Sequence, residues 1–153
     1  ITELPRAVLM AGYKDTSSSD AVYMLDWYAY GIGKVPVKVA TTYQNISDAW
    51  SLLIDQKWHD RITAIKANDG GLSYVEFFEY RKNKMSIPLF NIYCATGSNR
   101  EYYAERTDLI QLGQTTQAIY FAKLTNEGEQ SELALTGDEI KARFSLVNQA
   151  WNN

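Results

Sequence analysis

The only histidine of the chain stands beside a carboxylate, and this pair is the first place where the sequence offers chemistry. His59 directly precedes Asp60. An imidazole changes charge near neutral pH and a carboxylate neighbour makes it more basic, so the pair predicts a general base of a hydrolase. Side chains adjacent in sequence seldom face each other, and no nucleophile motif or second histidine accompanies them. A surface histidine on a short turn is therefore the competing interpretation.

Arg100 and Glu101 form a second possible hydrolase site, at the end of the loop 96–101. Because this loop follows a predicted central strand, its backbone amides and the guanidinium would bind an anion where the chain leaves the sheet. The loop has neither the nucleophile-elbow pattern nor the glycine pattern of a phosphate loop. An ordinary connecting loop is the competing interpretation.

Thiol and metal chemistry are not expected. Cys94 lies inside an apolar segment, where a free cysteine behaves as a small hydrophobic residue, so we expect an inert core thiol. One cysteine and one histidine supply neither an internal disulfide nor a zinc cluster. Four oxygen-bearing residues in turns lack calcium-loop spacing, and turn chemistry explains them. They are Asp15, Asp20, Asn68 and Asp69. The sequence therefore predicts no metal and no cofactor.

Aromatic residues are unusually frequent, with 11 tyrosines and four tryptophans. Since a core of this size needs fewer rings, we expect some at the surface, where they stack on sugars or fill a protein interface. The candidate binding residues are Trp27, Tyr28, Tyr30, Arg100, Tyr102 and Tyr103. The competing interpretation is that a sheet uses tyrosine at half-exposed edge positions. If these aromatic residues share one surface, a binding role is favoured. If they are dispersed over the molecule, a structural or spacer role is favoured.

The composition describes one folded domain that spans residues 1–153. With 46% hydrophobic residues and a net charge of -3, the chain buries enough surface to fold without a disulfide or metal. Basic residues are not clustered, which disfavours a nucleic-acid partner, and no apolar run approaches the roughly 20 residues of a membrane-spanning helix. The chain opens at Ile1 rather than Met, which suggests a segment of a longer product.

Strand patterns dominate the elements that must position these residues. The predicted strands are 7–13, 21–30, 35–43, 72–80, 87–95 and 118–124. Gly31–Lys34 predicts a hairpin turn, and Val35, Val37 and Val39 alternate as in a half-buried strand. The continuous apolar run 87–95 predicts a central strand. Periodicity leaves 49–65 open between helix and strand.

The C-terminus predicts an amphipathic helix. Thr136 and Glu139 form a capping box, and apolar residues then follow at helical spacing. They are Ile140, Phe144, Val147 and Trp151. Because such an apolar stripe normally lies across a sheet, the sequence predicts an α+β fold, a two-layer sandwich in which a mainly antiparallel sheet is covered by helices.

The segment Trp50 to Trp58 resembles the opening of small Mog1/PsbP-like domains, in which an aromatic-apolar strand runs into a Pro-x-x-Trp helical turn. The later order of segments is similar as far as Trp151, and Asp55 stands where the family usually has Pro. The resemblance divides the chain into an N-terminal strand and hairpin (1–44) and a Mog1/PsbP-like portion (45–153). It favours a strand over Trp50 to Ile54. In particular, the segment is similar to the variants appended to secreted lipoproteins of Gram-positive bacteria.

These observations together predict a non-catalytic interaction module of a secreted or cell-surface bacterial protein. The missing catalytic motif and the aromatic surplus point to binding, and the resemblance implies the location. The partner would be another protein or domain, or a cell-wall glycan; the sequence leaves the oligomeric state open. The alternatives are a hydrolase that uses His59 with Asp60 or the Arg100/Glu101 loop, and a structural spacer domain.

Overall fold

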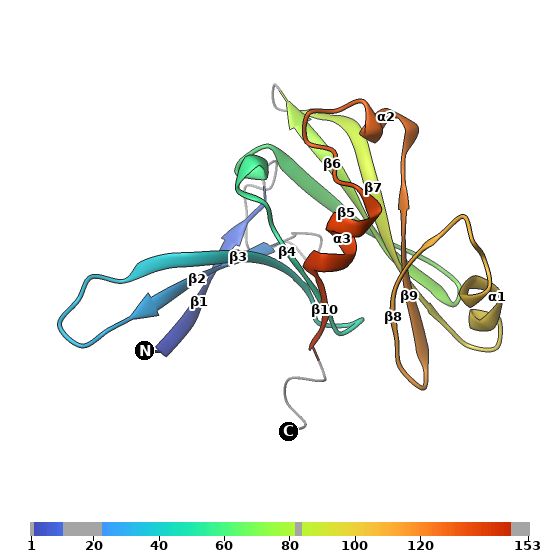
Figure 1. The fold of residues 1–153 in the computed structure, drawn as a ribbon, viewed down its shortest axis with the longest axis horizontal. Helices are drawn as coiled ribbons and strands as arrows, with labels where there is room; N and C mark the ends of the chain where they lie inside the picture. Colours follow the sequence, from blue (N-terminus) through green and yellow to red (C-terminus); the bar gives the residue numbers. More distant parts are fainter. Residues whose placement is uncertain (1, 11–22, 82–83, 148–153) are drawn as a thin grey trace.

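The computed structural model of the protein describes residues 2–10, 23–81 and 84–147. Over these residues the chain forms ten β-strands, three short α-helices and one 3₁₀ helix. The strands build two antiparallel sheets with a shared core between them, so the second layer of the fold is itself a sheet (Figure 1). The predicted α+β sandwich, a sheet covered by helices, is therefore wrong.

The first sheet combines the strands of the N-terminal third with the last strand of the described chain. Its order is β1-β2-β3-β4-β10, and neighbouring strands are antiparallel. The strands are β1 (Thr2–Leu9), β2 (Tyr23–Tyr30), β3 (Val37–Asn45), β4 (Trp50–Leu53) and β10 (Phe144–Leu146). The predicted hairpin is confirmed as β2 and β3. It belongs to this sheet because β3 also pairs with β4.

The second sheet has the order β5-β6-β7-β9-β8 and is also antiparallel. Its strands are β5 (Ile62–Asp69), β6 (Leu72–Arg81), β7 (Lys84–Thr96), β8 (Ile110–Gln114) and β9 (Ala118–Leu124). The apolar run 87–95 is confirmed as the central strand β7. Strand β8 was not predicted from the sequence.

The main core lies between the two sheets and is rich in aromatic rings. Phe77 of β6 stacks on Phe90 of β7, with ring centroids 4.8 Å apart. Phe77 also meets Tyr43 of β3 edge-on at 5.4 Å, which links the second sheet to the first. Trp50 continues this contact, with its ring 5.3 Å from that of Tyr43. Much of the aromatic surplus is therefore packing between the layers.

The ambiguous stretch 49–65 contains two strands and a short helical turn. Strand β4 is followed by the 3₁₀ helix η1 (Gln56–Trp58) and then by β5. The Asp55 side chain caps η1 by accepting a hydrogen bond from the Lys57 N–H at 3.0 Å. The Trp58 indole is 1% exposed and donates to the Leu133 carbonyl at 2.8 Å. The strand and helical turn that the resemblance favoured at Trp50 to Trp58 are present.

The predicted C-terminal helix is only partly confirmed. Thr136 and Glu139 form both hydrogen bonds of the capping box, and helix α3 (Gly137–Arg143) follows. The helix ends at Arg143, because Phe144 enters β10 and pairs with Leu52 of β4. The prediction that Phe144 and Val147 continue the helix is wrong, since sheet pairing decides the structure there. Trp151 lies outside the described residues.

The other helices are short. Helix α1 (Arg100–Ala104) follows β7, and α2 (Asn126–Glu129) follows β9. Gly128 of α2 is buried against β7, where a Cβ atom would lie 2.2 Å from the Leu89 carbonyl oxygen. In the described part of the chain, no helix has the length and apolar content needed to cross a bilayer.

Candidate functional site

The outer part of the first sheet extends beyond the second sheet as an arm (Figure 1). We define the arm as residues 2–6 and 27–40. In the arm, β1 and β2 contact mainly each other and β3. At its tip the Lys34 N–H donates to the Gly31 carbonyl at 3.2 Å, and Gly33 has a φ of 71°, which suits glycine in a tight turn. The described arm is therefore one sheet thick.

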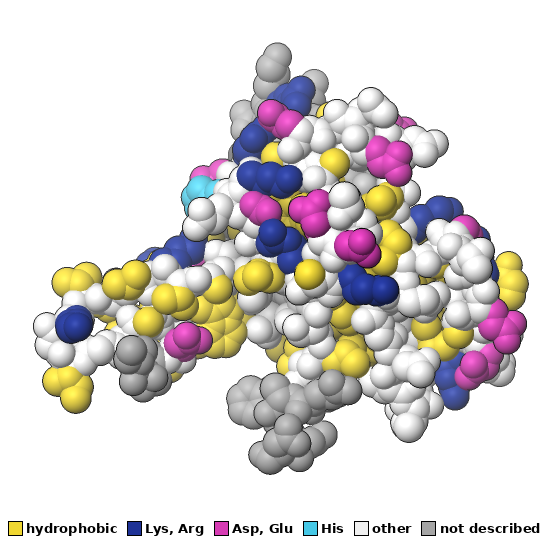
Figure 2. Space-filling model, viewed as in Figure 1, with side chains coloured by type: hydrophobic (Ala, Val, Ile, Leu, Met, Phe, Trp, Pro, Cys, Tyr) yellow, Lys and Arg dark blue, Asp and Glu magenta, His cyan; other side chains and the backbone are white. Residues whose placement is uncertain are grey.

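Large apolar side chains on the arm face solvent. They are Leu4, Tyr30, Ile32, Val35, Val37 and Val39. Val35 is 82% exposed and Val37 is 61% exposed, although their alternation predicted a half-buried strand. The strand is confirmed from Val37, but the predicted burial is wrong, because the second sheet does not reach this part of β3. Figure 2 shows hydrophobic side chains gathered over the arm.

One free edge of the arm is strand β1, which pairs with β2 alone among the described strands, and the other is the start of β3, where residues 37–40 pair with β2 but not with β4. Pro5 lies within β1, opposite Trp27. Proline has no N–H to donate, so it is tolerated at a sheet edge and hinders the addition of a further strand. At the β1 edge the arm therefore offers a partner its side chains more than its backbone.

The predicted aromatic residues of the hairpin lie on the arm in different environments. Trp27 is half-buried, and its indole N–H donates to Thr42 Oγ1 at 2.9 Å. Tyr28 is also half-buried, whereas Tyr30 is 41% exposed. Tyr30 is thus the aromatic residue of this group that is most open to a partner.

The second predicted group lies on α1, at the opposite side of the molecule from the arm (Figure 1). The Arg100 guanidinium donates to the Gly97 carbonyl at 2.9 Å and to the Thr116 carbonyl at 3.3 Å. These bonds connect the loop to the β8–β9 turn. They use N–H groups of the guanidinium that was predicted to bind an anion. Glu101 is exposed, with its carboxylate 3.9 Å from Arg100 Nε.

Tyr102 and Tyr103 belong to a row of rings on the outer face of the second sheet. Tyr103 stacks on Phe121 with centroids 5.0 Å apart, and Phe121 stacks on Tyr93 at 4.9 Å. Tyr74 extends the row at 5.1 Å from Tyr93. Tyr102 is 63% exposed at the other end and carries the Arg106 guanidinium over its ring at 5.6 Å. The two predicted aromatic groups therefore form no shared surface.

A cleft of about 630 Å³ lies where the arm meets the sandwich, and His59 and Asp60 both line it. His59 Nε2 is 3.3 Å from Asp60 Oδ2, and both side chains are largely exposed. The described lining contains no serine or cysteine, and Thr41 Oγ1 donates to Asp26 at 2.7 Å. The histidine thus has a cleft and a carboxylate, but no free nucleophile among the described lining residues.

The remaining charges of this cleft are paired with one another. Lys38 Nζ lies 3.2 Å from Asp26 Oδ1, across β2 and β3. Arg143 donates to Asp55 Oδ2 at 2.8 Å, which joins the end of α3 to the start of η1. These pairs hold the walls of the cleft together. Among the described residues, no group of three or more acidic, histidine or cysteine side chains is placed to hold a metal ion.

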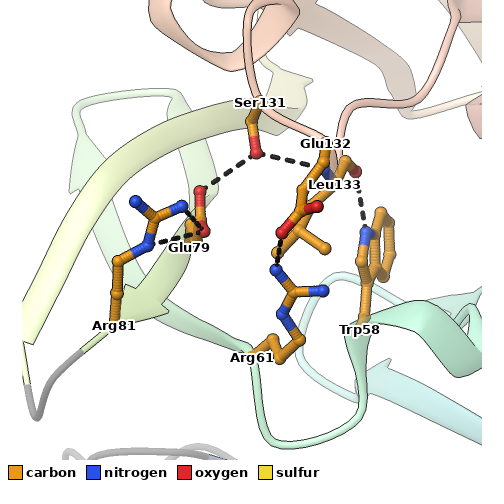
Figure 3. Close-up of polar contacts among 7 residues, drawn as sticks. All are labelled: Trp58, Arg61, Glu79, Arg81, Ser131, Glu132 and Leu133. Atoms are coloured by element: carbon orange, nitrogen blue, oxygen red, sulfur yellow. Dashed lines mark hydrogen bonds and ion pairs between the residues drawn. The ribbon is translucent and has the colours of Figure 1, made fainter.

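A buried carboxylate that the sequence did not single out proves to be structural. Glu79 of β6 is 1% exposed and accepts hydrogen bonds from Arg81 Nη2 at 2.5 Å and from Ser131 Oγ at 3.0 Å (Figure 3). Ser131 Oγ in turn accepts from the Leu133 N–H at 3.0 Å. Arg61 forms an ion pair with Glu132 nearby. The cluster fastens the segment 131–133 to the second sheet.

Cys94 is 3% exposed in β7, in agreement with the expected core thiol. Burial and, to a smaller degree, the nearby Asp48 carboxylate raise the pKa of this thiol to about 11, so the reactive thiolate is scarce at neutral pH. Of the oxygen-bearing turn residues, Asn68 and Asp69 end β5 before the β5–β6 turn. Asp15 and Asp20 lie outside the described residues.

Comparison of the chain with protein-family models, with curated proteins and with solved structures gives no match. The Mog1/PsbP-like resemblance of residues 45–153 is neither supported nor opposed by these comparisons, and it stays a prediction.

Proposed function

We propose that this chain is a non-catalytic interaction module that binds another protein through its arm. The observation that carries the proposal is the exposure of six large apolar side chains on an element one sheet thick. Burying apolar surface in an interface is favourable by roughly 25 cal/mol per Å². Leu4 and Val37 lie on opposite faces of the arm, so a partner that covers these side chains has to contact both faces.

The chemistry of the arm favours a protein partner over a glycan. Five of the six exposed residues are aliphatic, and Tyr30 is the one aromatic ring among them. Sugars bind to flat aromatic faces and hydrogen-bonding groups, whereas aliphatic side chains fill apolar pockets of proteins. The partner surface is therefore expected to be apolar at its centre. The location of the module at a bacterial cell surface is part of the proposal and rests on the sequence resemblance alone.

The two alternatives differ from this proposal in what the arm does. In a spacer domain, the arm packs permanently on a neighbouring domain of the same chain, and the dispersal of the aromatic residues favours such an architectural role for the rings. In a hydrolase, His59 in the cleft acts as the base. The second idea requires a nucleophile or an activated water that the described lining does not supply.

Site-specific photo-crosslinking tests the proposal. A photo-reactive amino acid replaces Val37 on the arm in one variant and Gln117, an exposed residue of the β8–β9 turn, in a matched control. Both variants are expressed in the source organism as part of the full natural chain. We expect one discrete crosslinked product from position 37 and none from position 117. Combining the first label with Val35→Ser should abolish the product.

The products distinguish the interaction module from the spacer domain. An intermolecular product identifies a separate partner protein, and an intramolecular crosslink to another domain identifies a spacer. Equal labelling from both positions, or no product from position 37, would overturn the proposal that the arm is an interface.

A further inference from the structure

The β3 side of the arm has a strand edge that no described strand covers. Strand β3 pairs with β4 from Thr42 to Asn45, and one further bond runs from the Ile54 N–H to the Thr41 carbonyl at 2.8 Å. Beyond this bond the chain turns away from β3 and enters η1 (Figure 1). Residues 37–40 therefore pair with β2 on one side and have no described strand on the other. This free edge is about 13 Å long, at roughly 3.3 Å per residue.

The two free edges of the arm differ in how they are protected. The β1 edge contains Pro5, whereas residues 37–40 contain no proline. Their one charged side chain, Lys38, is held by Asp26, with Nζ 3.2 Å from Oδ1. Val39 is the extra residue where the β2–β3 register shifts, so a bulge twists this edge but supplies no charge. Because prolines and free charges oppose the addition of a strand, the β3 edge is the more open of the two.

The free edge of β3 forms part of the cleft of about 630 Å³ where the arm meets the sandwich. Lys38, Val39 and Ala40 line the cleft from the edge, and Ile54 and Asp55 line it from the segment that leaves β3. Side chains of a strand point alternately to the two faces of its sheet. A strand added to this edge would therefore place every second side chain in the cleft and the others on the opposite face of the sheet.

The charges of the cleft favour a basic partner. The lining contains three carboxylates and two permanent cations. Two of the carboxylates are paired with a lysine or an arginine. The third, Asp60, has only the His59 imidazole as an ion-pair partner among the described residues, at 3.3 Å, and its side chain is largely exposed. A lysine or arginine of a partner therefore finds a free carboxylate at this end of the cleft.

We infer that the partner of the arm contributes an extended peptide segment, with apolar residues at alternate positions and a lysine or arginine, that adds to residues 37–40 of β3 as a further strand. The inference rests on the proposed function, since it states how the partner binds. Backbone hydrogen bonds to the edge supply affinity, and the side chains that enter the cleft supply specificity. The segment occupies the place in the sheet that the chain leaves after Ile54. A folded surface and a second copy of this chain are the other occupants, which the test distinguishes.

Selection from a display library of random dodecapeptides on the immobilised natural chain tests the inference. We expect the enriched peptides to alternate apolar and polar residues and to carry a lysine or arginine. A synthetic copy of one should shift the amide NMR resonances of 37–41 and 54–60. Two further copies carry N-methyl groups on one or the other set of alternate backbone nitrogens. Only one set faces β3 in an added strand, so one copy should bind at least tenfold more weakly and the other should bind like the parent peptide.

Two substitutions with matched controls locate the site. Val39→Lys places a free charge on the edge at a side chain that is 50% exposed, and it should weaken peptide binding at least tenfold. Leu4→Lys is its control, because Leu4 is 51% exposed on β1 and does not line the cleft. Asp60→Asn should weaken binding about threefold. Its backbone has a φ of 57°, which asparagine also adopts, and the exposed Asp69, changed to asparagine, is its control.

The inference is wrong if no peptide is enriched, if the peptide shifts resonances elsewhere, or if both N-methylated copies bind like the parent. It is also wrong if Val39→Lys and Asp60→Asn both bind as tightly as the natural chain. A dimer of the purified chain that Val39→Lys dissociates in sedimentation would make a second copy the occupant. In each of these cases a crosslinked product from position 37 would leave the proposed function standing, with a different kind of partner surface. Absence of that product overturns the proposed function separately.

Discussion

The arm and the sandwich use the same kind of strand but differ in what their apolar side chains contact. Strand β3 passes through both regions and shows the difference within nine residues. At its start, Val37 and Val39 lie on the arm, where they are 61% and 50% exposed. Near its end, Tyr43 is 2% exposed between Trp50 and Phe77. The register with β2 shifts between these two parts of β3, so Val37 and Tyr43 lie on opposite faces of the sheet, and the alternation of the valines predicted neither their face nor the layer that covers it.

This contrast explains why the arm is the proposed interface. The sandwich buries its own apolar side chains, because those of both sheets pack in one core. The arm has no second layer among the described residues, so its apolar side chains contribute little to the stability of the isolated chain. Substitutions in the two regions should then differ sharply in their effect on folding.

The largest effect is expected in the core. Phe77→Ala should lower the free energy of unfolding by about 3–5 kcal/mol, because Phe77 is fully buried and packs on both Tyr43 and Phe90. Val37→Ala on the arm should change it by less than about 0.5 kcal/mol. Urea denaturation of both variants measures the difference. A comparable loss from Val37→Ala would mean that the arm is buried in the isolated chain.

A smaller loss is expected from the polar cluster of the sandwich. Arg81→Met removes the guanidinium that neutralises the buried Glu79 carboxylate, and it should cost about 3 kcal/mol. The double variant Glu79→Gln with Arg81→Met should recover most of this loss, because no buried charge then remains. Arg106→Met is the control, since its partner Asp108 is exposed, and it should have little effect. If Arg81→Met behaves like this control, Glu79 is solvated in solution.

The smallest effect is expected at the start of α3. Thr136→Ala removes the side-chain cap and should cost about 1 kcal/mol. The hydrogen bond from the Thr136 N–H lowers the pKa of Glu139 below its ordinary value of 4.5. Because the folded pKa is depressed, the stability that Glu139 contributes is present above pH 4.5 and is lost as the pH falls through the folded pKa.

Thermal unfolding across this acidic range checks the capping box. The natural chain should be more stable than Glu139→Gln at neutral pH, and the difference should shrink in acid. The exposed Thr116, whose side chain has no hydrogen bond to a described residue, provides the control substitution Thr116→Ala. A constant difference between the natural chain and Glu139→Gln would show that the carboxylate contributes nothing through its charge.

Local patterns predicted several parts of the fold correctly. The hairpin around Gly31–Lys34, the central strand β7 and the capping box at Thr136 each depend on interactions between residues close in sequence or on one continuous apolar run. The strand β9 has the predicted bounds for the same reason. These local predictions are correct because tertiary packing favours the same conformations as the local sequence.

The candidate sites could not be predicted to the same extent. A hollow beside the β3–β4 turn brings Asn45, Asp48 and Ser73 together across two sheets, and the sequence contains no spacing that links these residues. The aromatic residues Trp27 and Tyr102 looked alike in the sequence but lie on opposite sides of the molecule. The pairs predicted from the sequence, His59 with Asp60 and Arg100 with Glu101, are each neighbours in the chain.

The sequence by itself determined that this chain is rich in strands, places an inert thiol in a central strand, and begins its last helix at Thr136. These features depend on local hydrogen bonds and on apolar runs. The tertiary structure decided that the second layer is a sheet, that Phe144 leaves the helix to pair with Leu52, and that the valines of β3 face solvent. Each of these outcomes depends on which distant segment packs against a residue, and periodicity carries no information about that partner.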